Sequence, residues 1–144
     1  MISLRRGLRA ATAALLLSAS ILVPACKRDE PPGPPRKVEL SELLKDVAAD
    51  SKKAEAKWAG KNIESTGLVN KVGEDVDTHE RVVWVGSGRP LALDAIVCRL
   101  PRAEAKKADA LQPKQRVTVR GRVGGVFFGN IMMTGCQLEA APGG

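Results

Sequence analysis

The chain has 144 residues, 44% of them hydrophobic, and a formal net charge of +7. This length fits one small domain with flanking segments and excludes an assembly of several domains. Residues 38–139 carry 16 Lys and Arg against 14 Asp and Glu, so most of the excess positive charge lies before residue 38. The basic composition therefore does not favour a nucleic-acid-binding domain, which usually carries its positive charge within the fold.

Residues 1–25 have the character of a secretory signal peptide. Three arginines near the start precede an uncharged stretch of fourteen residues, Ala10–Val23. A membrane-spanning helix needs ~20 apolar residues, whereas this length suits the apolar region of a signal peptide. The residues that follow, Val23-Pro24-Ala25-Cys26, resemble the lipobox of bacterial lipoprotein precursors.

The resemblance implies that the chain is cut before Cys26 and that this cysteine is lipidated. The alternative is an incidental cysteine with cleavage by the general signal peptidase. Several acyl chains on one residue make attachment to a membrane lasting, and the proline-rich segment KRDEPPGPPRK makes residues 26–37 a candidate tether. By resemblance to the sorting rules of Gram-negative lipoproteins, Lys27 rather than aspartate after the cysteine favours the outer membrane, with the domain on the periplasmic side.

An amphipathic helix is expected at the start of the domain, which we place at residues 38–139. Apolar side chains recur at helical spacing between Leu40 and Ala48. Ser41 is a candidate N-cap, and Gly60 is a typical residue at a helix C-terminus. These signals predict one helix that continues through SKKAEAKW at 51–58.

After Gly60 the apolar pattern alternates, as in β-strands. KNIESTGLVNKV predicts the first strand, with Gly67 as a bulge or bend. A short helix is expected at 101–111, since Pro101 suits its first turn. The other strands are expected at 81–85, 94–100, 115–123 and 127–138, with a glycine-containing hairpin, GGVFFG, before the last.

This order of elements predicts a mainly β domain with an N-terminal helix. A helix between the third and fourth of five strands is typical of the five-stranded OB-fold barrel. Gly135 is expected to shift the inward phase of the last strand. Residues 140–144 are predicted to be a disordered tail.

Four stretches resemble the tRNA-anti-like family of bacterial OB-fold domains: KWAGKNIESTGLV, AIVCRL, LQPKQRVTVRGRVGG and GNIMMTGCQL. The resemblance runs from about Leu40 to Leu138 and implies an OB-fold. For secreted members it implies no particular activity.

Cys98 and Cys136 fall on the third and fifth expected strands, which are neighbours in an OB barrel. A chain that enters an oxidising compartment tends to pair its thiols. The alternative is two buried thiols that act as small apolar side chains. We favour a disulfide.

Trp84 is the one aromatic residue placed where the usual OB ligand-binding face would be, but a core or edge position is the interpretation that we favour for it. Arg116, Arg120 and Arg122 form a basic stripe that offers a site for an anion, or simply the charged outer face of a soluble strand. The single His79 lies in an acidic loop whose spacing matches no calcium motif.

No catalytic, metal-binding or cofactor-binding pattern can be built from one histidine and these cysteines. The sequence therefore predicts a non-catalytic binding module, anchored to the membrane through Cys26, with an envelope protein, a glycan or an anionic molecule as its ligand. The alternatives are a single-stranded nucleic-acid-binding protein, which we do not favour, and a structural lipoprotein with a protein partner.

Overall fold

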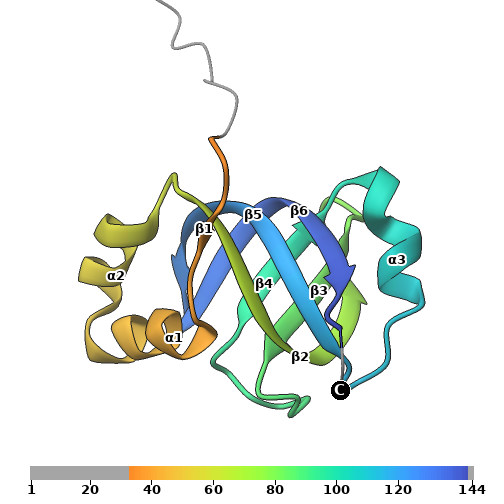
Figure 1. Cartoon of the computed structure of the whole chain (residues 1–144), viewed down its shortest axis with the longest axis horizontal. Coiled ribbons are helices and arrows are strands. Elements are labelled where there is room, and N and C mark those ends of the chain that lie inside the picture. The colour runs from red at the N-terminus through yellow and green to blue at the C-terminus, as the bar shows by residue number, and fades with distance from the viewer. Residues whose placement is uncertain (1–32, 143–144) are drawn as a thin grey trace, which may run out of the picture.

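The protein is mainly β, and its computed structural model describes residues 33–142 (Figure 1). The expected signal peptide and Cys26 lie outside the described residues. No helix within 33–142 has the length and apolar character needed to cross a bilayer. The five long strands are β2 (Asn62–Glu74), β3 (Arg81–Gly86), β4 (Ile96–Leu100), β5 (Arg116–Phe127) and β6 (Asn130–Ala140).

The strands are hydrogen-bonded in the order β2-β3-β4-β6-β5, and β5 returns to β2 to close a barrel. The β4–β6 pair is parallel, whereas the other pairs of long strands are antiparallel. This arrangement confirms the OB-fold predicted from the order of the elements.

One strand, β2, belongs to both halves of the barrel. Its residues 62–67 pair with β5 and its residues 68–74 pair with β3. Gly67 lies at the switch, where a Cβ would come within 2.8 Å of the side chains of both Leu40 and Val85. The bend expected at Gly67 is therefore confirmed, while the bulge of this strand falls two residues later, between Val69 and Lys71.

Two helices, not one, cover one end of the barrel: α1 (Leu40–Ala49) and α2 (Ser51–Trp58). The prediction of a single helix was wrong because the Asp50 side chain accepts hydrogen bonds from the backbone N–H groups of Lys52 and Lys53, which starts a new helix. The expected cap at Ser41 is also wrong, since α1 begins at Leu40. The indole of Trp58 donates to Asp46 at 2.9 Å and joins the two helices.

The end of the predicted tether lies on the barrel. Strand β1 (Arg36–Lys37) pairs in parallel with Ile63 and Glu64 of β2. The side-chain amide of Asn62 donates to the Gly33 carbonyl at 3.1 Å. This strand was not predicted because it has no apolar side chain and its partners are distant in the chain.

The expected helix at 101–111 is shorter in the structure. It consists of a 3-10 turn, η1 (Arg102–Glu104), and α3 (Ala105–Asp109), on the opposite side of the barrel from α1 and α2 (Figure 1).

A disulfide joins β4 to β6 inside the barrel. Gly135 has φ +61°, and the buried positions of β6 change there from Ile131 and Met133 to Cys136 and Leu138. The predicted phase shift therefore turns Cys136 inward, and its Sγ is bonded to that of Cys98, with 5.8 Å between the Cα atoms. Both residues are fully buried.

We predict that the double variant Cys98→Ala/Cys136→Ala loses about 3–4 kcal/mol of unfolding free energy, since the bond closes a loop of 38 residues in the unfolded chain. Guanidinium unfolding of the oxidised protein and the variant measures the difference. Equal stability would contradict a structural role for the bond.

Candidate ligand-binding surface

Trp84 lies on the outside of the barrel, not in its core. Along β3, Val83 and Val85 are fully buried, while Trp84 between them is partly exposed. Gly73 of β2 lies beneath the indole, and a Cβ there would come within 3.1 Å of the ring. The ammonium of Lys71 stands 4.3 Å from the ring centroid, in cation–π geometry. Trp84 of β3 thus presents an aromatic ring on the outer face, with the ammonium of Lys71 from β2 over it.

The outer face continues from Trp84 towards the hairpin between β5 and β6. Trp84 pairs with Val97, Val97 with Met132, and Met132 with Gly125. Residues directly opposite each other in a sheet lie on the same face. Phe127 follows Gly125 by two positions and belongs to the same outward-facing set.

The hairpin exposes two aromatic side chains. Phe127 is 61% exposed and Phe128 is 83% exposed, with their rings edge-to-face at 4.4 Å between centroids. Phe128 has φ +47° and Gly129 has φ +79°, as the two central residues of a type I′ turn require. A bulky residue seldom adopts a positive φ, and the conformation costs on the order of 1–3 kcal/mol. The position therefore retains an exposed aromatic ring at a cost in stability.

The loop between β3 and β4 adds two leucines beside this hairpin. Leu91 is 92% exposed and Leu93 is 80% exposed. A Cβ on Gly129 would lie 3.8 Å from the Leu93 carbonyl oxygen, so the loop and the hairpin tip are adjacent. We call the following residues the aromatic surface: Lys71, Trp84, Leu91, Leu93, Phe127 and Phe128.

The acidic loop between β2 and β3 is a self-contained turn. Asp75 accepts hydrogen bonds from the backbone N–H groups of Asp77 and Thr78, which lower the pKa of its carboxyl group. It also forms an ion pair with Arg99 at 3.0 Å. His79 bonds Glu74 at 2.8 Å. Within residues 33–142 no group of three or more potential metal ligands gathers.

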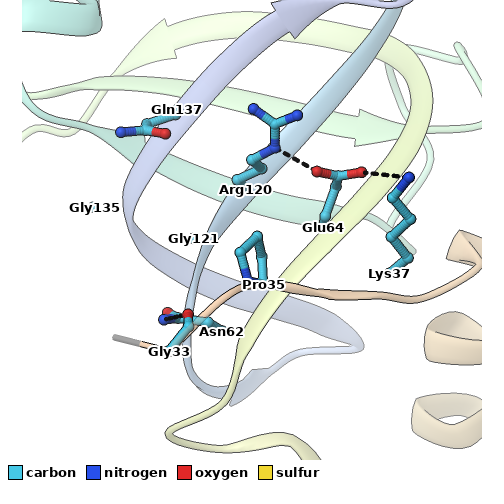
Figure 2. A pocket seen from close by; sticks show the side chains of 9 residues that line it. All are labelled: Gly33, Pro35, Lys37, Asn62, Glu64, Arg120, Gly121, Gly135 and Gln137. Atoms are coloured by element: carbon cyan, nitrogen blue, oxygen red, sulfur yellow. Dashed lines mark hydrogen bonds and ion pairs between the residues drawn. The ribbon is translucent and has the colours of Figure 1, made fainter. Parts of the chain in front are cut away.

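Arg120 of the predicted basic stripe is already paired with carboxylate side chains. Figure 2 shows it in a row with Glu64 and Lys37, in a groove of about 580 Å³ on the outer face of β2, β5 and β6. Its guanidinium donates to Glu64 and forms a second ion pair with Glu139 at 3.0 Å. The bond from Arg120 lowers the pKa of Glu64, and the same bond raises the pKa of Arg120. Arg120 therefore ties strands together, and its charge is balanced.

The arginines of the basic stripe do not lie next to Trp84. Arg116 and Arg122 are exposed on β5, whereas Trp84 is on β3, and β2 lies between these strands in the barrel. Thr118, between the arginines, shares a hydrogen bond of 2.8 Å with Thr66.

Lys71 and the hairpin aromatics were missed from the sequence. The bulge after Val69 sets the register that places Lys71 opposite Trp84, and nothing in the sequence locates that bulge. The exposed ring of Phe128 could have been predicted, because a phenylalanine precedes glycine in a turn where asparagine is usual.

Comparison with known proteins gives a family match and several structural neighbours. The tRNA_anti-like family model matches residues 10–137. No curated protein sequence matches the chain. A lipoprotein from Klebsiella pneumoniae to which nucleic-acid binding has been attributed is similar in structure, with a TM-score of 0.59 and 12% identity over 73% of this chain and 92% of that one.

Two further structures have a similar fold. The OBody AM1L10, solved bound to hen egg-white lysozyme, has a TM-score of 0.52 and 15% identity over 77% of this chain and 96% of its own. A protein from Leishmania major assigned as an aspartyl-tRNA synthetase has a TM-score of 0.51 and 10% identity over 73% of this chain, but 20% of that chain. At these identities the likeness shows the fold alone.

We predict that Phe128→Asn raises the unfolding free energy by about 1 kcal/mol, because asparagine tolerates a positive φ. Phe128→Ala is the matched control: it removes the exposed ring but keeps the unfavourable φ, so its stability should stay near that of the parent. Urea unfolding compares the three proteins. A less stable Phe128→Asn variant would show that the ring supports folding.

Proposed function

Because the chain belongs to the tRNA_anti-like family, and its barrel exposes an aromatic surface, we propose that it is a non-catalytic binding module of the cell envelope. In this proposal Cys26 carries the lipid anchor and residues 27–32 link it to the barrel. The aromatic surface contacts the partner. The Val23-Pro24-Ala25-Cys26 sequence after an apolar stretch supports the anchor.

One observation carries the binding role: Phe128 has an exposed ring although its positive φ is unfavourable for a bulky residue. Strained, exposed residues concentrate at functional sites, and contiguous exposed apolar side chains mark interaction surfaces. The aromatic surface contains one cation and no pair of acid and base groups, which suits binding rather than proton transfer.

The charges nearby favour a protein partner. Glu74, Asp77 and Glu80 border the β2–β3 end of the face, so a polyanion would meet repulsion there. Aromatic side chains are enriched at the cores of protein–protein interfaces, and the two exposed leucines add apolar area beside them. An OB barrel of similar fold, the OBody, binds the protein lysozyme.

Photocrosslinking in intact cells tests this role. p-Benzoylphenylalanine at position 128 should form a defined adduct that disappears when Trp84→Ala is introduced as well. The same probe at the exposed position Gln137, on the outer face that carries Arg120, is the control and should give no such adduct. An adduct formed from position 137 and not from position 128 would contradict the proposal.

A second candidate function is binding of single-stranded nucleic acid. It is favoured by the exterior position of Trp84 under Lys71, because bases stack on aromatic rings in OB-folds. The Klebsiella lipoprotein of similar fold supports it as well.

We predict weak binding, with a dissociation constant above about 100 μM at physiological salt, because few phosphates can be neutralised. Fluorescence anisotropy with a labelled oligothymidine and residues 33–144 measures it. Micromolar binding that is lost in Trp84→Ala would make nucleic acid the ligand.

The anchor is tested separately. Wild-type protein should stay with membranes after a wash with about 1 M salt, which screens charge interactions to ~3 Å, while Cys26→Ser should be released. Fractionation followed by immunoblotting measures both. Salt-resistant retention of processed Cys26→Ser protein would show that Cys26 is not the anchor.

A further inference from the structure

Three exposed cations gather where the chain enters the barrel. The guanidinium of Arg36 and the ammonium of Lys61 each stand 5.6 Å from the centroid of the Trp58 ring. Arg122 pairs with Asn62, the residue after Lys61, and its guanidinium lies 3.9 Å from where a Cβ on Gly60 would be. We call Arg36, Lys61 and Arg122 the basic corner.

The basic corner keeps its positive charge, unlike the cations around it. Lys57 also stands over the Trp58 ring, at 4.6 Å, but it pairs with Asp46 at 2.8 Å and with Glu42 at 3.4 Å. The bond from Lys57 lowers the pKa of Asp46, which keeps that carboxylate charged. Lys37 shares Glu64 with Arg120. None of the three corner residues has an ion-pair partner within residues 33–142.

The corner lies beside the attachment of the chain to the barrel. Asn62, which pairs with Arg122, holds the Gly33 carbonyl. Gly33 is seven positions after Cys26, and an extended chain of that length spans at most about 25 Å. A lipid on Cys26 would therefore keep this corner close to the membrane surface. Figure 1 shows the loop between β3 and β4 on the other side of the barrel from this entry point.

We propose that the basic corner binds the anionic phospholipid headgroups of the membrane that carries the anchor. The inference rests on the proposed lipid anchor for its geometry. A basic residue close to an anionic membrane strengthens binding about fivefold, and the attraction acts over ~8 Å at physiological salt. The contact would hold the barrel with its corner on the membrane and its aromatic surface turned away.

Vesicle sedimentation tests the proposal without the lipid. The protein is the mature chain, residues 26–144, with Cys26→Ser, and the vesicles contain either phosphatidylglycerol in phosphatidylcholine or phosphatidylcholine alone. We expect binding to the anionic vesicles alone, released by salt. The triple variant Arg36→Gln/Lys61→Gln/Arg122→Gln should weaken it by about 100-fold.

The control removes three other exposed charges, in Arg89→Gln/Arg102→Gln/Lys114→Gln, and should change binding less than threefold. Circular dichroism confirms that both variants are folded. Equal losses of vesicle binding in both variants would overturn the proposal. Unchanged vesicle binding in the corner variant would also overturn it. So would a corner variant that loses oligonucleotide binding but keeps vesicle binding. Salt-resistant fractionation of the lipidated wild type reports on the anchor alone, so either idea can fail without the other.

Discussion

The sharing of β2 between the two halves of the barrel is the constraint on which the rest of the structure depends. Its first half closes the barrel against β5 and carries β1, and its second half supports β3. The switch occurs at Gly67, where Leu40 of α1 and Val85 of β3 leave no room for a side chain. The bulge that follows brings Lys71 opposite Trp84. The position of α1, barrel closure and the outward face near Trp84 therefore all depend on how this strand bends.

Much of the fold could be predicted because local patterns of apolar residues and glycines determine it. A valine-rich run located β3, alternating valines located β5, and glycine at 135 predicted the phase shift that turns Cys136 towards Cys98. Two errors in secondary structure have physical causes: one is a local side-chain hydrogen bond, and the other is a pairing between residues distant in the chain. The Asp50 carboxylate accepts two backbone hydrogen bonds and so starts a second helix. The helix boundary was not predicted because the apolar pattern continues past this residue. The pairing of β1 depends on backbone hydrogen bonds to residues about 27 positions away, without an apolar signal.

The candidate surface was harder to predict than the barrel. A core or edge position was favoured for Trp84, whose ring instead lies on the outside of the barrel. Arg120 looked available in the sequence but is paired with carboxylates 56 and 19 positions away. Phe127 and Phe128 were interpreted as parts of a turn, and their exposure depends on how the hairpin projects from the barrel. Binding surfaces are built from loops that tertiary structure brings together, so local pattern reveals them poorly.

In the arrangement that we propose, one small barrel would hold a basic corner against the membrane and leave an aromatic surface open to a partner. Spin labels on the lipidated protein in anionic vesicles test this most directly, since Cys26 is then acylated and Cys98 is bonded to Cys136. Single cysteines at Phe128 and at Pro35, an exposed residue next to Arg36 that leaves the basic corner intact, would carry the label. Collision with a water-soluble nickel complex would report exposure. We predict that the label at position 35 is shielded at the headgroups and the label at position 128 is fully accessible. A shielded label at 128 with an accessible one at 35 would contradict this orientation.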